Sequence, residues 1–309
     1  MRRIRIALLA GGWSGEREVS LKSGKAIYNA LDKRKYDVFT CDPRDELHAL
    51  MEAKEEIDLA FNLLHGKYGE DGSMQGLLDI LGIPFLGSGV LSSVIAMNKK
   101  IAKGIFRNTG LRVAKEIVLR RGEDFSINEI IEILGSTSVV KPVGQGSSLG
   151  MSLCHNNKEL VTGIEKAFEY DEEIIIEEYV DGREVTCCVI GNQELETLPL
   201  IEIIPEASSR FFDYKAKYTP GACREICPAD LSQSIEESAR VCAKKAHQAL
   251  MCSVWSRTDM IIRDEKVYVL ETNTIPGMTE QSLVPLAAKT AGFSLSELVD
   301  KMIMFSLER

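Results

Sequence analysis

Short apolar runs divide the first third of the chain, and polar or amphipathic stretches separate them. The runs Ile4–Ala10, Tyr36–Cys41 and Ile57–Leu64 have the length and residue content of buried strands. Between the first two, apolar positions from Val19 to Leu31 recur at helical spacing. Strands that alternate with helices predict a doubly wound α/β domain with a parallel sheet. Ligands of such domains bind at the carboxyl ends of the strands.

After this region the pattern changes from alternating elements to closely spaced strands. A helix is predicted over residues 90–108, bridging into a second domain, with Lys99, Lys100 and Lys103 in one patch. Short turns after Asp181 predict antiparallel pairing, so the C-terminal part is α+β. The predicted domains are residues 1–97, 98–180 and 181–309. The other predicted elements are strands at 116–119, 139–141, 173–178 and 184–190, helices at 73–81, 127–134, 232–251 and 282–291, and a last helix after the capping box at 294–297.

The segment from Asp259 to Asn273 predicts a β-hairpin. Met260–Ile262 and Val267–Leu270 are apolar strand runs, and Asp264–Lys266 is the polar turn between them. A two-residue turn would put Asp259 and Glu271 on opposite faces. With a three-residue loop, the pairs are Arg263 with Val267, Ile261 with Val269, and Asp259 with Glu271.

Two carboxylates and an amide then share one face of this hairpin, because side chains alternate along a strand. Directly opposed Cβ atoms lie about 5 Å apart, so Asp259, Glu271 and Asn273 would repel one another without a cation. Oxygen ligands suit Mg²⁺, and a bridging carboxylate suits two metal ions about 4 Å apart. The alternative is a solvated strand face. The period-two spacing of Glu271 and Asn273, followed by Pro276-Gly277, favours the metal site.

A second candidate site is the glycine-rich segment Gly144–Gly150, which follows the predicted strand that ends at Lys141. Closely spaced backbone N–H groups and serine hydroxyls suit a phosphate, and a lysine beside them strengthens that interpretation. The segment is not a P-loop, since no Gly-Lys-Ser/Thr opens a helix. A flexible hairpin loop is the alternative interpretation.

Two further candidates lie where strands of the first sheet end. Glu16 closes the glycine turn after the first strand, and His65 opens a glycine-rich turn after the third. A lone His is more often structural, but its position beside a glycine turn at a strand end makes a site equally plausible here.

Residues 205–228 have no clean periodicity and are rich in aromatic and basic residues. A long structureless segment inside a compact domain is usually functional or disordered, and the aromatic content argues against permanent disorder. We expect a lid that closes over an anionic ligand.

Composition restricts the class of protein. The 309 residues suggest two or three domains, and the net charge of −9 disfavours a large nucleic-acid surface. The eight Cys have no zinc-site or disulfide spacing, which indicates a reducing cytoplasm. No apolar run reaches the length of a membrane span, and the apolar N-terminus is better explained as a strand than as a signal peptide.

Together, these stretches resemble the D-alanine–D-alanine ligases of the ATP-grasp superfamily. The resemblance runs in order from about residue 4 to residue 300. The motifs that carry it are Gly11–Ser20, Leu64–Gly72, Val140–Pro142, Gly146–Met151, Tyr214–Tyr218, Ser256–Asp259 and Glu271–Thr279. No single motif is specific for this family, but seven motifs in the family's order are. Thr272, Ile275 and Ser256 depart from commoner family residues without removing a charged group.

The resemblance implies a reaction in which ATP phosphorylates the carboxylate of one D-alanine. The amine of a second D-alanine then attacks the acylphosphate, and phosphate leaves. ATP is expected between the central and C-terminal domains. The family's metal ligands correspond to Asp259, Glu271 and Asn273, holding two Mg²⁺ ions, with Mn²⁺ as a possible substitute and a monovalent cation as a possible activator. Its ATP-binding residues correspond to Lys99, Lys141, Ser148, Glu177, Tyr179, Val180, Glu184 and Lys217.

The resemblance also implies substrate contacts. Glu16 corresponds to the carboxylate that holds the first ammonium, with His65 near it and with Ser147 and Tyr218 hydrogen-bonded to it. Arg257 and the Gly277 N–H correspond to the groups that stabilise the oxyanion of the tetrahedral intermediate. The contacts for the second carboxylate correspond to Ser282 and Leu283 at a helix N-terminus.

Tyr218 favours amide formation, since ligases that make the D-alanine–D-lactate ester commonly have His there. The resemblance also implies a homodimer, no nucleic-acid or membrane partner, and a role in peptidoglycan precursor synthesis. Three alternatives remain. They are another ATP-grasp ligase, a non-catalytic nucleotide-binding regulator, and a dinucleotide oxidoreductase, which the bulky Trp13 in the first glycine turn disfavours.

Overall fold

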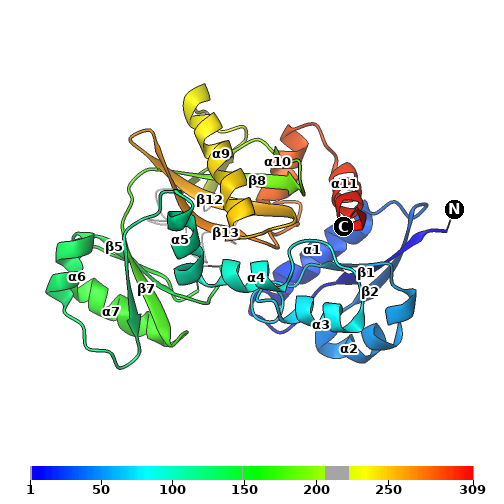
Figure 1. Ribbon diagram of the computed structural model, residues 1–309, viewed down its shortest axis with the longest axis horizontal. Coiled ribbons are helices and arrows are strands. Elements are labelled where there is room, and N and C mark those ends of the chain that lie inside the picture. Colours follow the sequence, from blue (N-terminus) through cyan, green and yellow to red (C-terminus); the bar gives the residue numbers. More distant parts are fainter. Residues whose placement is uncertain (1, 148, 206–222, 309) are drawn as a thin grey trace.

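The chain forms three sheets with helices packed around them (Figure 1). The computed structural model describes residues 2–147, 149–205 and 223–308. The helices are α1 (Arg17–Ala30), α2 (Pro43–Glu52), α3 (Ser73–Leu81), α4 (Val90–Met97), α5 (Lys99–Asn108), α6 (Ile127–Leu134), α7 (Asn157–Phe168), α9 (Gln233–Ala249), α10 (Leu283–Thr290) and α11 (Leu295–Leu307), with the short 3₁₀ turn η1 (Lys54–Glu56).

Most of the longer strands match predicted runs to within a few residues at their ends, whereas β6 and β11 were not predicted. They are β1 (Ile4–Leu9), β2 (Tyr36–Cys41), β3 (Leu59–Asn62), β4 (Glu116–Arg120), β5 (Ser138–Pro142), β6 (Ser152–Cys154), β7 (Glu173–Glu178), β8 (Arg183–Gly191), β9 (Glu196–Thr197), β10 (Ile201–Pro205), β11 (Cys223–Ile226), β12 (Val254–Arg263) and β13 (Lys266–Asn273).

The N-terminal sheet is parallel, as the sequence predicted, and its strand order is β2-β1-β3. Ile6 and Leu8 point to one side, where α1 and α11 cover them, while Ala7 and Leu9 point to the other, where α2 and α3 pack. Both faces are buried, which explains the near-continuous apolar run in β1. The last helix of the chain therefore covers the N-terminal sheet and packs against α1, and Figure 1 places the C-terminus close to α1.

The predicted single helix over residues 90–108 is wrong, because two helices meet at Asn98. The side chain of Asn98 accepts a hydrogen bond from the Ile101 backbone N–H, so it caps the start of α5. The prediction that the three lysines of this segment form one patch is also wrong. Lys99 reaches a cleft, Lys100 pairs with Glu173 near the surface, and Lys103 is buried.

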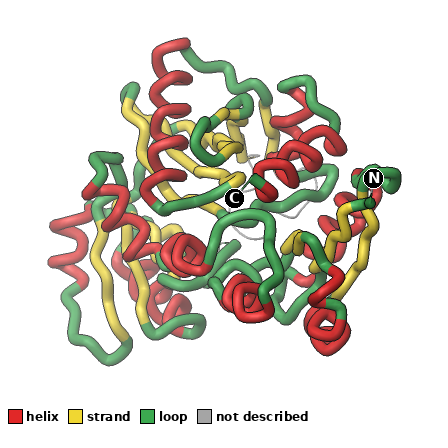
Figure 2. The backbone as a smooth tube through the Cα atoms, turned by 45° about the vertical axis from the view of Figure 1, so that its right-hand side comes forward, coloured by secondary structure: helices red, strands yellow, loops and turns green. Residues whose placement is uncertain are grey.

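The central sheet is antiparallel, with the order β4-β7-β5-β6. Ile174 and Ile176 of β7 and Val140 of β5 face α6 and α7, which back the sheet on one side (Figures 1 and 2). This core contains only residues between 117 and 176, so the region packs as a unit of its own.

The third sheet has the order β11-β10-β8-β12-β13, with β9 beside β8, and it is antiparallel as predicted. The adjacent residues Cys187 and Cys188 of β8 lie on its two faces, in different cores. The face with Cys187 packs on α9. The face with Cys188 joins the core of the N-terminal sheet through Trp255. All eight cysteines are free thiols.

The segment predicted to be a lid is only partly described. Pro205 ends β10 and Cys223–Ile226 forms β11, so the two ends of residues 205–228 are paired strands rather than loop. Tyr218, Lys217 and Ser148 lie outside the described residues. Within the described part of the chain, no helix is both long enough and apolar enough to cross a membrane.

The capping box predicted at Ser294–Glu297 is present and starts α11. Because α11 covers the N-terminal sheet, we expect Leu298→Ala, at a fully buried position of this helix, to lower the free energy of unfolding by about 2–5 kcal/mol. Met304→Ala on the exposed side of the same helix should change it by less than about 0.5 kcal/mol. Denaturant unfolding measures both values, and equal effects would contradict the packing of α11.

Candidate active site

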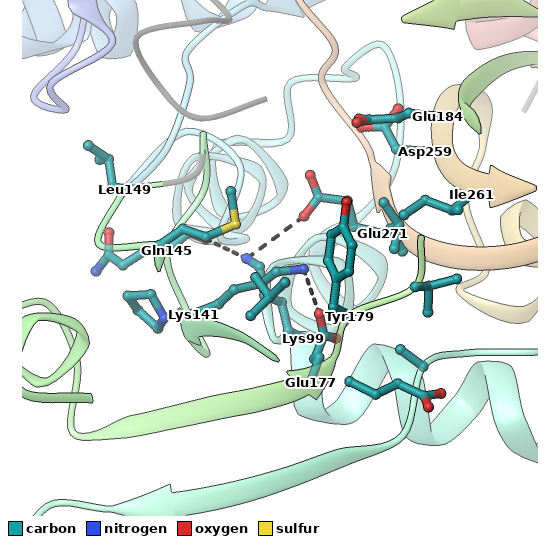
Figure 3. Close-up of a pocket in the computed structure, with 17 residues that line it drawn as sticks. Lys99, Lys141, Gln145, Leu149, Glu177, Tyr179, Glu184, Asp259, Ile261 and Glu271 are labelled. Carbon is teal, nitrogen blue, oxygen red and sulfur yellow. Dashed lines mark hydrogen bonds and ion pairs between the residues drawn. The ribbon is translucent and has the colours of Figure 1, made fainter. Parts of the chain in front are cut away.

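A cleft opens between the central and third sheets. Figure 3 shows it with charged groups at its centre. Its lining comes from α5, β5, β7, β8, β12 and β13 and from the loops beside them. The lining residues are Lys99, Ala114, Val139, Lys141, Pro142, Gln145, Leu149, Met151, Glu177, Glu178, Tyr179, Val180, Glu184, Asp259, Ile261, Leu270 and Glu271.

The predicted ATP-binding residues within the described chain all line this cleft. These are Lys99, Lys141, Glu177, Tyr179, Val180 and Glu184. Sequence reasoning missed the apolar wall of the cleft, to which Ala114, Val139, Met151, Ile261 and Leu270 contribute. Their spacing gave no signal, since the wall is assembled from separate strands and loops. A cleft with one apolar wall and one charged end suits a molecule that has a flat apolar part and an anionic part.

Two lysines supply the positive charge of the cleft (Figure 3). Lys141 Nζ lies 2.6 Å from Glu177 Oε2. Burial by itself would lower the pKa of Lys141, but the neighbouring Glu177 carboxylate outweighs it and raises that pKa. Lys99 Nζ donates to the backbone carbonyl of Gln145 and lies 3.9 Å from Glu271 Oε2. The Lys141 ammonium therefore stays charged, and Lys99 is held beside the glycine-rich segment by its bond to Gln145.

The turn after α7 anchors the glycine-rich segment at its base. The Gly144 backbone N–H donates to the Asp171 carboxylate at 2.7 Å, and Gln145 Nε2 donates to the Tyr170 carbonyl at 3.1 Å. Gly150 has φ +72°, and a Cβ there would lie 2.7 Å from the Tyr170 ring, so only glycine fits. The two hydrogen bonds thus fix the start of the segment, and Gly150 lies close against the Tyr170 ring.

The hairpin that carries the acidic residues has a two-residue turn, so the predicted three-residue loop is wrong. Asp264 and Glu265 have φ +48° and +58°, as a type I′ turn requires at its two central positions. Arg263 therefore pairs with Lys266 rather than Val267, and Ile261 with Tyr268 rather than Val269. This register alone would put Asp259 opposite Leu270.

A β-bulge restores the predicted pairing of Asp259 with Glu271. The register shifts between Asp259 and Met260, because Met260 pairs with Val269 and Leu270 is the extra residue of β13. The bulge moves Glu271 to the position opposite Asp259 on the neighbouring strand. The two carboxylates consequently both line the cleft, as predicted, although the predicted reason was wrong.

Asp259 is bound by protein donors in this structure. Arg257 donates to its two carboxylate oxygens at 2.9 and 2.8 Å, Thr186 Oγ1 donates at 2.5 Å, and Asn273 Nδ2 donates at 3.1 Å. Arg257, predicted to stabilise an oxyanion, is thus paired with a predicted metal ligand.

The predicted metal site is a set of oxygen donors rather than a preformed cluster of acids. Among the described residues, no group of three or more His, Cys, Asp and Glu is placed to hold a metal ion. The predicted set contains two carboxylates and one amide. Hard oxygen donors from facing strands fit Mg²⁺ in kind. Full coordination by Asp259 requires Arg257 to give up its two hydrogen bonds.

A second group of predicted residues meets at the carboxyl ends of β1 and β3. Glu16, which precedes α1, is 5% exposed, and the Ser147 hydroxyl of the glycine-rich segment donates to its carboxylate. His65 is also 5% exposed, and burial lowers its pKa although the nearby Glu16 opposes the shift. Its Nε2 atom has no hydrogen-bond partner within the described residues. The structure therefore brings Glu16, His65 and Ser147 together.

Glu70 belongs to this group, and sequence reasoning missed it. Its carboxylate accepts a 2.6 Å hydrogen bond from the Gly66 backbone N–H. A Cβ built on Gly146 would lie 3.8 Å from Glu16 Oε2 and 3.9 Å from Glu70 Oε2, so both carboxylates border the same loop. Burial, followed by the charge of Glu16, raises the pKa of Glu70 to about 8. The only signal in the sequence was its place in the glycine-rich turn after His65.

The remaining predicted residues lie at the start of α10. Ser282 precedes this helix and Leu283 is its first residue, so they lie at a helix N-terminus as predicted. The Thr279 backbone N–H donates to Ser282 Oγ at 3.0 Å, and the Met278 N–H donates to Ser23 Oγ of α1 at 3.2 Å. Gly277 faces Ser282, whose Oγ would lie 3.0 Å from a Cβ at position 277. The segment is thereby fixed against α1, the helix that Glu16 precedes.

The shifted pKa of Glu70 predicts a pH-dependent stability. Its carboxyl ionises at about pH 8 when folded but near its ordinary value of 4.5 when unfolded, so the folded state holds more protons between these values. The free energy of unfolding therefore falls as pH rises through this window. We expect the drop in Tm from pH 5 to pH 9 to be smaller in Glu70→Gln than in the unchanged protein. Asp79→Asn, on the exposed face of α3, should behave like the unchanged protein, and an equal drop in Glu70→Gln would contradict the shift.

Comparison with known proteins gives consistent matches over the full chain. The family model described as D-ala D-ala ligase N-terminus matches residues 5–48 and 43–88, and that of the D-ala D-ala ligase C-terminus matches residues 105–304. A D-alanine–D-alanine ligase of Syntrophobacter fumaroxidans is 52% identical over 99% of this chain and 98% of its own length. One from Desulfotalea psychrophila is 48% identical over 99% and 96%.

Solved structures show the same relationship. The D-alanine–D-alanine ligase of Bacillus anthracis complexed with ATP has a TM-score of 0.87 and 37% identity, over 99% of this chain and 98% of its own. The VanG D-Ala:D-Ser ligase of Enterococcus faecalis has a TM-score of 0.85 and 33% identity, over 99% of this chain and 100% of its own. With both family models and near full-length relatives in agreement, the chain belongs to the D-alanine–D-alanine ligase family.

Proposed function

We propose that this protein joins two molecules of D-alanine to D-alanyl-D-alanine at the expense of ATP, for peptidoglycan precursor synthesis. The observation that carries the proposal is the contact between Ser147 and Glu16. It brings the anchored glycine-rich segment of the cleft to a buried carboxylate at the end of the N-terminal sheet. A phosphate donor and an amino acid can therefore meet at this point.

ATP would lie in the cleft between the central and third sheets. Its base fits the apolar wall, and its phosphates fit the end with Lys99 and Lys141. Tyr179 and Val180, which follow β7, would contact the base, and Glu184 the ribose. A ligase of Bacillus anthracis with the same fold was solved with ATP, which supports this placement. Ser148 and Lys217 are proposed to contact the phosphates as the resemblance implies.

Asp259, Glu271 and Asn273 would hold Mg²⁺ at the phosphate end of the cleft. The ion would neutralise phosphate charge and align the transferred group. Arg257 would leave Asp259 when the metal binds and become free to face the substrate with the Gly277 N–H. Lys99, already close to Glu271, stays beside the same phosphates.

The first D-alanine would bind with its ammonium at Glu16, a buried anion at the right place to pair with it. A carboxylate oxygen of this D-alanine attacks the γ-phosphorus, and ADP leaves. The amine of the second D-alanine then attacks the acyl carbon, the bond between that carbon and the bridging oxygen breaks, and phosphate leaves with this oxygen as the peptide bond forms. The amine loses its proton in this step, and Ser147 with Glu16 offers a hydrogen-bonded acceptor for it.

The second D-alanine would place its carboxylate at the N-terminus of α10, where Ser282 and the Leu283 N–H lie and the helix dipole favours an anion. A second candidate product is the D-alanyl-D-serine dipeptide, because a D-Ala:D-Ser ligase shares the fold over the whole chain. Tyr218 is proposed to favour an amine over a hydroxyl acceptor.

We further propose three domains, residues 1–97, 98–180 and 181–309, in a homodimer. The separate core of the central sheet supports an independent central domain. The core shared by β1, Trp255 and α11 supports a first and a third domain that move together.

Phosphate release in the presence of ATP and Mg²⁺ tests the function. D-alanine alone should release phosphate, and mass spectrometry should detect the dipeptide, whereas L-alanine should not. If phosphate is released only after D-serine or D-lactate is added, the assignments of the fold and of the first substrate site stand, but the second substrate is not D-alanine. No release by a folded protein that binds ATP would favour a regulator.

Glu271→Gln should abolish turnover without unfolding the protein, because it removes one of the two facing carboxylates from the proposed metal site. Glu265→Gln, in the exposed turn of the same hairpin, should keep full activity. Steady-state kinetics with thermal unfolding separates the two effects, and near-normal turnover in Glu271→Gln would refute the metal assignment.

Glu16→Gln should raise the KM for the first D-alanine more than the KM for ATP, since it removes the charge that pairs with the ammonium. Glu18→Gln, exposed on the first turn of α1, serves as the matched control. If both KM values rise equally, Glu16 does not belong to the amino-acid pocket.

A further inference from the structure

Lys103 is a buried cation that the proposed mechanism does not use. It lies one turn after Lys99 on α5 and is only 1% exposed, and burial of a charged lysine is costly unless it is paired. Its ammonium contacts Glu177 Oε1 and lies 3.2 Å from Glu116 Oε2. Glu177 uses its other oxygen, Oε2, for Lys141 in the cleft. Lys103 and Lys141 therefore share one carboxylate.

These groups are part of a row of alternating charges that runs from the surface to the cleft. In order, its members are Arg107, Glu116, Lys103, Glu177 and Lys141. Three cations and two anions leave one net positive charge. Arg107 is half exposed at one end of the row, and Lys141 lines the cleft at the other.

Glu177 is the member that connects the row to the cleft. Burial alone would raise its pKa, but Lys141 and Lys103 together outweigh this and hold the pKa at about 2. The carboxylate therefore stays ionised, and its charge is divided between two ammonium groups. Without Lys103, the row would hold two cations and two anions, so the net positive charge beside the cleft would be lost.

We propose that Lys103 is a positioning residue for nucleotide binding. It holds one oxygen of Glu177, so that Lys141 keeps its place and an effective positive charge for the phosphates of ATP. This inference rests on the proposed function, since it requires ATP in the cleft. Lys103 does not itself line the cleft and so acts through Glu177.

The test is calorimetric titration of the full-length protein with ATP and Mg²⁺. Lys103→Met should weaken ATP binding by at least about tenfold, which corresponds to about 1.4 kcal/mol. The KM for D-alanine should change less than about twofold if only the charge on Lys141 is affected. Lys100→Met is the matched control, because Lys100 lies on the same helix but pairs with Glu173 away from the cleft. It should bind ATP as the unchanged protein does.

Measuring the effect of Lys103→Met in a second variant, Glu177→Gln, distinguishes the positioning role of Lys103 from a general contribution to the stability of the fold. In Glu177→Gln the shared negative charge is absent, so adding Lys103→Met should weaken ATP binding little further. Equal weakening in both backgrounds, or unchanged binding by Lys103→Met, would overturn the inference. If Lys103→Met does not fold, the test rests on the ATP affinities of Glu177→Gln and of the double variant. A large difference between these two affinities would overturn the inference. Failure of the unchanged protein to bind ATP would reject the proposed function instead.

Discussion

The register between β12 and β13 is the constraint on which the candidate active site depends. A two-residue turn sets one register, and the bulge at Leu270 changes it before the strands reach Asp259 and Glu271. Because side chains alternate along a strand, a shift by one residue would turn Glu271 away from the cleft. The same bulge gives the cleft an apolar residue, Leu270, beside the carboxylate.

Charge compensation inside the cleft explains how a protein with net charge −9 can offer a site for an anion. Lys99 lies between the Gln145 carbonyl and Glu271, and Lys141 lies beside Glu177. Each lysine has a nearby carboxylate, and for Lys141 this neighbour raises the pKa and keeps the ammonium ionised. The overall charge of the chain therefore says little about the local field that a ligand meets.

Packing between distant parts of the sequence brings the two halves of the site together. The last helix, α11, covers the N-terminal sheet, and Trp255 of the third sheet joins the same core. Glu16 at the end of that sheet is thereby held at a fixed distance from β12 and α10. The glycine-rich segment reaches the same place from the central sheet through Ser147. The site thus lies where the three sheets of the molecule meet.

The sequence by itself determined many of the strands and helices, the parallel N-terminal sheet, the antiparallel third sheet and the family, because these depend on local periodicity and on short motifs. It also named eight of the seventeen residues that line the cleft. Sequence reasoning missed two local features, the break at Asn98, which its cap sets, and the pairing of Arg257 with Asp259 within β12. Only the tertiary structure decided the bulge at Leu270 and the places of Glu70 and Lys103, which depend on contacts between separate elements. Local spacing does not encode such contacts, so the burial and the partners of these charges could not be read from the chain.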